Sequence, residues 1–168
     1  MGHHDHKHSA REIAAKVHVI TVSDTRSEAQ DTSGSFIRSA VEEAGHKLSG
    51  YTLLRDEPEQ ISAKVREIAG GRTADVVIIN GGTGISRRDS TFEAIDAMLQ
   101  KRIPGFGELF RMLSYEEIGP AAMMSRATAG LFDGLAVFSI PGSEKAVRLA
   151  VSKLILPELA HVVWEASR

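Results

Sequence analysis

A short glycine-rich segment followed by two arginines and an aspartate has the composition of a phosphate-binding site. The segment reads Gly81-Gly82-Thr83-Gly84, and Arg87, Arg88 and Asp89 follow it closely. Glycines let a ligand come close to the backbone, whose N–H groups bind anions. The guanidinium of Arg87 or Arg88 can bind phosphate through two parallel hydrogen bonds, and Asp89 can hold the Mg²⁺ that phosphates usually bring. The segment therefore predicts a site for a phosphorylated ligand with a divalent metal.

This segment differs from two widespread nucleotide-binding motifs. A P-loop has a Lys followed by Ser or Thr after its second glycine, which is lacking here, and the segment does not match G-x-G-x-x-G. Many α/β proteins also carry a glycine between a strand and a helix for reasons of chain geometry alone. The segment in isolation leaves both interpretations open.

Three further groups of small or polar residues follow predicted strands. They are Ser23 with Asp24, then Asp56, and then Pro141-Gly142-Ser143. In open α/β sheets, ligands bind at the carboxyl ends of the strands, so we expect these groups to converge with the glycine segment. The alternative for Asp56 is that it caps the helix predicted to begin near Pro58.

The elements that must position these residues follow from the spacing of apolar side chains. Val76 to Ile79 form an unbroken apolar run, which is typical of a strand buried on both faces. Ser90 and Glu93 have the spacing of a capping box at the start of the next helix. The expected strands lie in residues 16–22, 46–54, 76–79 and, as a hairpin around Asp133-Gly134, 131–140. The first expected helix runs through Phe36 to Ala44, and Asp31, Thr32 or Ser33 would cap its start. Further helices are expected at 58–69, 90–100, 106–113 and 119–124, and a long C-terminal helix, which Pro157 kinks or splits, follows Ser143.

Strands that alternate with helices predict an α/β fold with a mostly parallel central sheet, joined by one antiparallel strand from the hairpin. The 168 residues suit a single domain, which we assign to residues 15–168 after a flexible His-rich leader at 1–14. The stripe of apolar residues from Phe106 to Leu113 is a candidate for core or for a subunit interface.

Composition excludes several classes of function. The net charge of −2 argues against a nucleic-acid surface, which would carry a basic excess. The absence of cysteine excludes disulfides and thiol catalysis. No apolar run is long enough for a membrane span and no signal peptide is evident, so we expect a cytoplasmic protein without a membrane partner.

Several motifs in the same order resemble the MoaB/Mog family of molybdenum cofactor biosynthesis proteins. The glycine segment with Arg88-Asp89 is similar to the family's signature, and Pro104-Gly105-Phe106 also matches. Other matching segments are Thr21-Val22-Ser23-Asp24, Asp31-Thr32-Ser33-Gly34, Ser125-Arg126-Ala127-Thr128-Ala129-Gly130 and Pro141-Gly142-Ser143. The resemblance covers residues 15–165 in outline, which is nearly the whole chain.

This resemblance implies a three-layer molybdopterin-binding fold and assembly as a homotrimer or hexamer. It implies a nucleotidyltransferase activity, in which molybdopterin is adenylylated by Mg-ATP to adenylyl-molybdopterin and pyrophosphate. The alternative is a non-catalytic molybdopterin-binding or carrier module of the same pathway. Insertion of molybdate would require a separate partner protein.

The resemblance also implies roles for individual residues. The family's two functional aspartates correspond to Asp56 and Asp89, which we interpret as Mg²⁺ ligands because a phosphate nucleophile barely needs a general base. The expected contacts to ATP lie in Gly81, Gly82, Thr83, Gly84, Arg88, Pro141, Gly142 and Ser143. The expected contacts to molybdopterin are Ser23, Asp24, Ser33, Gly34, Ser114, Ser125 and Arg126. Ser143 stands where the family often has asparagine.

Overall fold

The computed structural model describes residues 13–168. The expected His-rich leader at 1–14 lies outside the described residues except for Ile13 and Ala14. No helix within residues 13–168 has the length and apolar character needed to cross a membrane.

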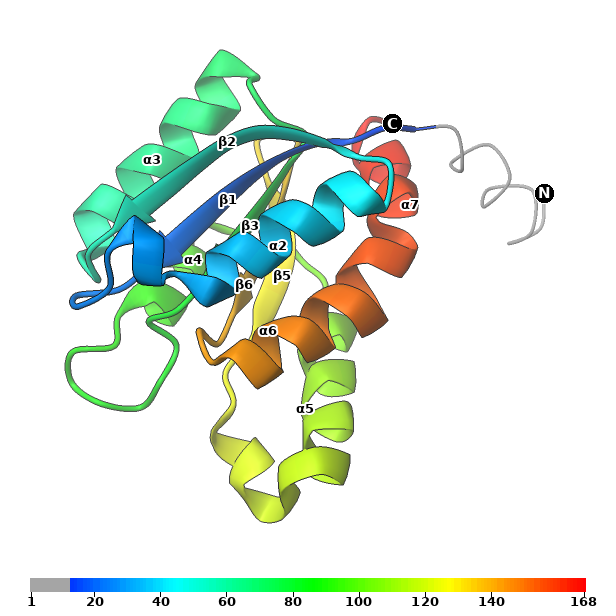
Figure 1. Cartoon of the computed structure of the whole chain (residues 1–168). Coiled ribbons are helices and arrows are strands. Elements are labelled where there is room, and N and C mark those ends of the chain that lie inside the picture. The colour runs from blue at the N-terminus through cyan, green and yellow to red at the C-terminus, as the bar shows by residue number, and fades with distance from the viewer. Residues whose placement is uncertain (1–12) are drawn as a thin grey trace.

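A six-stranded sheet forms the centre of the molecule, and its order along the sheet is β2-β1-β3-β6-β5-β4 (Figure 1). The strands are β1 (Lys16–Val22), β2 (Lys47–Leu54), β3 (Val76–Asn80), β4 (Lys101–Arg102), β5 (Thr128–Phe132) and β6 (Leu135–Ile140). Neighbours among β2, β1, β3 and β6 pair in parallel, whereas β5 is antiparallel to both β6 and β4. The expected mostly parallel sheet with one antiparallel strand is confirmed.

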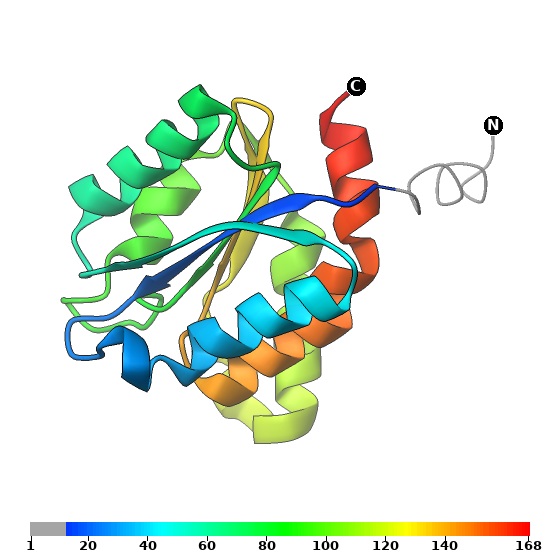
Figure 2. The ribbon, with the colours of Figure 1, turned by 45° about the horizontal axis from the view of Figure 1, so that its top comes forward.

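Helices cover both faces of this sheet and make the fold a three-layer sandwich (Figure 2). One face is covered by α3 (Pro58–Gly71) and α4 (Thr91–Met98). The other face is covered by α2 (Thr32–Glu43), α5 (Pro104–Ile118), α6 (Glu144–Ala150) and α7 (Leu156–Ala166). Short 3-10 turns occupy η1 (Glu28–Gln30) and η2 (Gly119–Met124).

The sheet separates two hydrophobic cores, and β3 contributes to both. Val76 and Ile78 pack with the α2, α5, α6 and α7 layer, while Val77 and Ile79 pack with α3 and α4. All four side chains are fully buried. Successive side chains of a strand point to opposite faces, so a strand buried on both faces must be apolar at every position.

The hairpin between β5 and β6 forms at the expected Asp-Gly pair. Asp133 and Gly134 have φ values of +48° and +79°, which is the backbone of a type I′ turn. Phe132 therefore pairs with Leu135 across the turn. Because β5 runs back along β6, the residues that precede β5 lie beside the carboxyl end of β6.

Two helix boundaries differ from expectation, whereas the C-terminal helix is interrupted near Pro157 as expected. The helix α5 extends from Pro104 to Ile118, beyond the expected 106–113. The helix α4 ends at Met98 because the N–H of Gln100 donates to Leu131 of β5, and the chain joins the sheet edge there. The C-terminal helix is split by a π-helical turn at Val151–Ile155, with Pro157 in the first turn of α7, where its missing N–H is tolerated.

Candidate functional site

The carboxyl ends of four parallel strands meet at one edge of the sheet. Ser23 follows β1, Gly81 follows β3 and Pro141 follows β6. After β1 the chain continues to β2 on one side of the sheet. After β3 it continues to β4 at the opposite edge, so the strand order reverses between β1 and β3. Such a reversal is where open α/β sheets form their ligand crevices.

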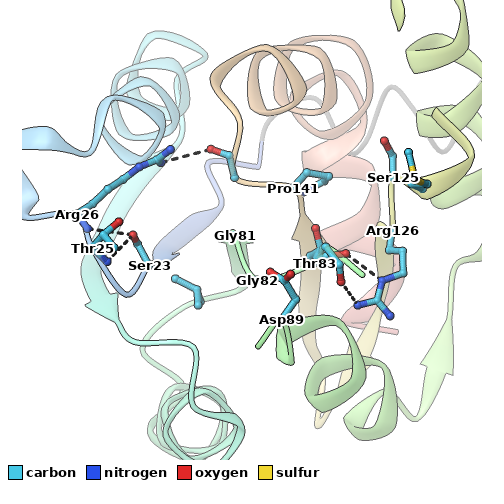
Figure 3. A pocket seen from close by; sticks show the side chains of 14 residues that line it. Ser23, Thr25, Arg26, Gly81, Gly82, Thr83, Asp89, Ser125, Arg126 and Pro141 are labelled. Atoms are coloured by element: carbon cyan, nitrogen blue, oxygen red, sulfur yellow. Dashed lines mark hydrogen bonds between the residues drawn. The ribbon is translucent and has the colours of Figure 1, made fainter. Parts of the chain in front are cut away.

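A pocket of about 340 Å³ lies at this point (Figure 3). The predicted residues that line it are Ser23, Gly81, Gly82, Thr83, Gly84, Asp89, Ser125, Arg126, Pro141 and Gly142. The lining residues that the sequence analysis did not select are Val22, Thr25, Arg26 and Met124. Thus the glycine segment, two of the other three strand-end groups and the residues before β5 converge as predicted.

The glycine loop requires its glycines because backbone and side chains press against them. Gly81 and Gly82 have φ values of +106° and +65°, which other residues rarely adopt. A Cβ on Gly81 would lie 2.1 Å from the carbonyl oxygen of Val22, and one on Gly82 would lie 2.0 Å from Oγ1 of Thr91. The N–H of Gly81 donates to the carbonyl of Ile140 at 3.0 Å, which ties the loop to the end of β6.

Asp56 lies beneath this loop and anchors the start of α4. Its carboxylate is buried and accepts hydrogen bonds from the hydroxyls of Ser90 and Thr91, at 2.7 and 3.1 Å, and from the N–H of Ser90 at 3.3 Å. A Cβ on Gly82 would lie 2.6 Å from Oδ2 of Asp56. Asp56 therefore does not cap the helix that follows it in sequence; Glu57 occupies the N-cap position of α3.

The capping box expected at Ser90 and Glu93 does not form. Ser90 is the N-cap residue of α4, but its side chain makes no capping bond to the helix backbone. The hydroxyl of Ser90 donates to Asp56, and the carboxylate of Glu93 is bound by Arg126. Both side chains of the motif therefore bond to residues that are distant in sequence, because a charged group forms a stronger hydrogen bond than a local backbone N–H.

Asp89 lines the pocket at the end of the charged loop. Its Oδ2 accepts the N–H of Ser86 at 3.2 Å and also the Ser86 hydroxyl. A Cβ on Gly84 would lie 2.6 Å from the same oxygen, so the carboxylate rests against the glycine loop. The two predicted functional aspartates thus contact the same loop, Asp56 at Gly82 and Asp89 at Gly84.

Arg88 is bound by carboxylates. Its Nε and Nη2 donate to the two oxygens of Asp24 at 2.7 and 3.0 Å, and Nη2 also donates to Glu57 at 2.8 Å. The Arg88 guanidinium and the N–H of Asp56 lower the pKa of Asp24 to about 2. Arg88 and Asp24 do not belong to the pocket lining; instead they join the loop after β1 to the glycine loop.

Arg126 holds the glycine loop from the opposite side. Its guanidinium donates to the carbonyls of Thr83, at 2.9 Å, and of Gly84, and it pairs with Glu93. The same group lies over the ring of Phe92, 4.8 Å from the centroid. Four partners from two segments, the glycine loop and α4, therefore fix this side chain, as Figure 3 shows for the loop carbonyls.

The segments after β1 and β6 are joined through the carbonyl of Gly142. The hydroxyl of Ser33 donates to it at 3.0 Å, and Nη1 of Arg26 donates at 3.4 Å. Gly34 lies apart from the pocket, and its N–H donates to Asp31, the N-cap of α2, at 2.9 Å. Ser33 and Gly34 thus stabilise the segments next to the pocket without lining it.

A second pocket, of about 580 Å³, has four predicted residues in its lining, and two of these do not line the first pocket. This pocket includes Ser114 and Ser143 and shares Ser125 and Pro141 with the first. The hydroxyl of Ser143 accepts the N–H of Ala146 at 3.3 Å and so caps α6. The 17 predicted residues therefore do not all line the same cavity: some line the first pocket, some the second, and others neither.

Sequence comparison finds a family model that matches residues 18–161 and is described as "Probable molybdopterin binding domain". Molybdenum cofactor biosynthesis protein B of Bacillus subtilis is 52% identical over 162 residues, which cover 96% of this chain and 95% of that protein. A solved structure of a Molybdenum cofactor biosynthesis protein B is 49% identical with a TM-score of 0.90, covering 93% of this chain and 98% of that one. The tungsten cofactor synthesizing protein MoaB from Pyrococcus furiosus is 37% identical with a TM-score of 0.83, covering 92% and 98%.

Proposed function

This chain belongs to the MoaB/Mog family of molybdopterin-binding proteins, and on that premise we propose that it adenylylates molybdopterin with Mg-ATP. The family places the chain in molybdenum cofactor biosynthesis. The observation that carries the specific reaction is that a glycine loop, a carboxylate and two guanidinium groups line one pocket at the strand-order reversal. Those groups suit the transfer of a phosphoryl-linked group.

The proposed reaction transfers AMP between two phosphates. A terminal phosphate oxygen of molybdopterin attacks the α-phosphorus of ATP, and the bond from that phosphorus to the oxygen bridging the β-phosphorus breaks. Pyrophosphate leaves with the electron pair of the broken bond. Because the nucleophile is already anionic, the protein has to position two phosphates and offset their charge, as in other phosphoryl transfers.

The two aspartates suit a magnesium ion that arrives with the nucleotide. Asp89 lines the pocket, and among residues 13–168 the Oδ2 of Asp56 accepts only the 3.3 Å bond from the N–H of Ser90, which it shares with Oδ1. Residues 13–168 contain no cluster of three metal-ligating side chains, but Mg²⁺ commonly takes one or two carboxylates and completes its shell with phosphates and water. Asp56 and Asp89 would hold the ion, which offsets phosphate charge when bound.

A second candidate is a module that binds molybdopterin without catalysis. The specific observation in its favour is that Asp56 already accepts bonds from Ser90 and Thr91. In this function Asp56 would keep the loop in shape, and Asp89 alone would face the ligand.

The test is an assay of the purified chain with molybdopterin, ATP and Mg²⁺, in which adenylyl-molybdopterin is separated by chromatography. We expect product from the native chain and none when the metal is chelated. Asp89→Asn should abolish most of the product, while Glu43→Gln, an exposed charge at the end of α2, should not. Tight binding of molybdopterin without product would support the binding module instead.

A further inference from the structure

Two arginines line the pocket, and they differ in what they already bind. The guanidinium of Arg126 donates to two loop carbonyls and pairs with Glu93. Arg26 has no carboxylate partner within residues 13–168, and the one hydrogen bond that its guanidinium makes there is the 3.4 Å contact from Nη1 to the carbonyl of Gly142. That contact is near the outer limit of a hydrogen bond and is correspondingly weak.

The backbone of Arg26 is nevertheless held in place. The hydroxyl oxygen of Ser23 accepts the N–H groups of Thr25 and Arg26 at 3.3 and 3.1 Å, so the loop turns sharply after β1. Ser27 then begins the η1 turn with a capping box to Gln30. In Figure 3, Arg26 lies on one side of the glycine loop and Arg126 on the other. The side chain of Arg26 thus extends from a structured turn toward the pocket.

We propose that Arg26 binds a phosphoryl group of the ligand in this pocket, and that Arg126 is a positioning residue that holds the glycine loop. The guanidinium of Arg26 has most of its donors free and can form the two parallel bonds that phosphate accepts. Only a weak bond to Gly142 is exchanged when it does so. Arg126 cannot turn to a ligand without leaving two carbonyls and Glu93 without their donor.

Arg88 is excluded from the same task by its partners. It pairs with Asp24 and Glu57, and it does not line the pocket. Arg87 does not line the pocket either. Of Arg26, Arg87, Arg88 and Arg126, Arg26 alone combines a place in the pocket with a guanidinium that no carboxylate of residues 13–168 neutralises. The identity of the ligand rests on the proposed function, in which both ATP and molybdopterin carry a phosphoryl group.

The experiment measures binding without turnover. ATP, inorganic pyrophosphate, adenosine and molybdopterin are each titrated into the native chain, Arg26→Gln and Arg126→Gln. Arg66→Gln, which removes an equal charge from the exposed face of α3, is the matched control. Thermal unfolding of each variant is followed in parallel.

We expect Arg26→Gln to weaken binding of a phosphoryl ligand about tenfold to a hundredfold, the range for a charge-assisted hydrogen bond, with an unchanged unfolding midpoint. Adenosine binding should not change, and Arg26→Lys should recover part of the loss. A loss confined to ATP and pyrophosphate assigns the contact to the nucleotide, and a loss confined to molybdopterin assigns it to the pterin phosphate. Arg126→Gln should lower the unfolding midpoint.

Equal affinities of the native chain and Arg26→Gln for ATP and for molybdopterin would overturn the proposal. So would a native chain that binds none of the phosphorylated probes, or an equal loss of adenosine binding. An Arg126→Gln variant that loses affinity at an unchanged unfolding midpoint would overturn the positioning role. Binding through Arg26 without adenylyl product would contradict the proposed function and leave this inference standing.

Discussion

Asp56 and Asp89 contact the same loop, but the protein around them depends on each to a different degree. Asp56 is buried and satisfies three donors at the start of α4, whereas Asp89 is half-buried and, among residues 13–168, bonds only to Ser86. A buried donor that loses its acceptor is costly because it cannot turn to water. A substitution of Asp56 can therefore reduce activity either by destabilising the start of α4 or by removing a metal ligand. A substitution of Asp89 acts through the loss of the ligand.

We predict that Asp56→Ala lowers the free energy of unfolding by about 2–3 kcal/mol, because the hydroxyls of Ser90 and Thr91 lose a charged acceptor. Asp89→Ala should change it by less than about 1 kcal/mol, because its partner Ser86 is exposed and can bond to water instead. Urea denaturation of both variants measures the difference. Equal stabilities would contradict the anchoring role of Asp56.

Two histidines should make stability depend on pH. Burial lowers the pKa of His18, whose Nε2 lies 2.8 Å from the hydroxyl of Thr52, and the positive charge of Lys64 acts in the same direction while Glu67 opposes it. Burial also lowers the pKa of His46, whose Nδ1 accepts the N–H of Ala15. Protonation at Nδ1 would remove that acceptor.

Because both pKa values are lower in the folded chain, the unfolded chain binds more protons below its own pKa of about 6.5. Stability is complete above this value and falls as the pH drops below it. We predict that the free energy of unfolding decreases between about pH 7 and pH 5, and that His18→Gln and His46→Gln each make this decrease shallower. A pH profile that is the same in both variants and the native chain would exclude these histidines as the cause.

At the scale of elements, the turn between β5 and β6 isolates a backbone effect. A Cβ on Gly134 would meet no atom within 4 Å, and the φ of +79° is the sole obstacle to a larger residue. Gly70 in α3 has equally open space but lacks a positive φ. The two glycines therefore form a matched pair that differs in backbone conformation.

We predict that Gly134→Ala destabilises the chain by about 1–2 kcal/mol, the cost of a left-handed conformation for a residue with a Cβ. Gly70→Ala should stabilise it by about 0.5–1 kcal/mol, because alanine favours the helix and restricts the unfolded chain. Thermal and chemical unfolding can both determine the signs. Two changes of the same sign would contradict the role given to the turn.

At the scale of the whole molecule, α5 and η2 carry a group of exposed apolar side chains. The expected stripe from Phe106 to Leu113 divides: Phe106 and Phe110 are buried in the core, whereas Leu109 is 47% exposed. The other exposed members of this surface are Met112, Tyr115, Ile118, Met123 and Met124. Leu109, Met112, Tyr115 and Ile118 follow one another at intervals of three residues along α5, and a large exposed apolar group usually marks a protein interface.

We predict that the chain self-associates through this surface, in line with the trimer or hexamer that its family resemblance implies. Met112→Glu should shift the protein toward monomers, because burying a charge in an apolar interface is unfavourable. Ala63→Glu, on α3 across the sheet, is the control and should not. Sedimentation velocity measures both; a native chain that remains monomeric would refute the prediction.

The sequence alone determined the main strands and helices, though not the edge strand β4, and the edge of the sheet at which they meet. Apolar periodicity and turn residues are local signals, so Val76 to Ile79, the Asp133-Gly134 hairpin and the split at Pro157 could be predicted from neighbouring residues. Parallel strands then bring their carboxyl ends together whatever the details of packing, which is why the glycine loop and the Pro141 loop were expected to meet.

Only the tertiary structure decided which charged groups pair. Arg88 binds Asp24 across 64 positions of the chain, Asp56 binds Ser90 across 34, and Arg126 binds Glu93 across 33. No local pattern reports such distant partners, because an ion pair depends on distance in space and on competing groups nearby. For the same reason the sequence did not single out Arg26, whose proposed role follows from its place in the pocket and from the carboxylate partners that Arg88 and Arg126 have and that it lacks within residues 13–168.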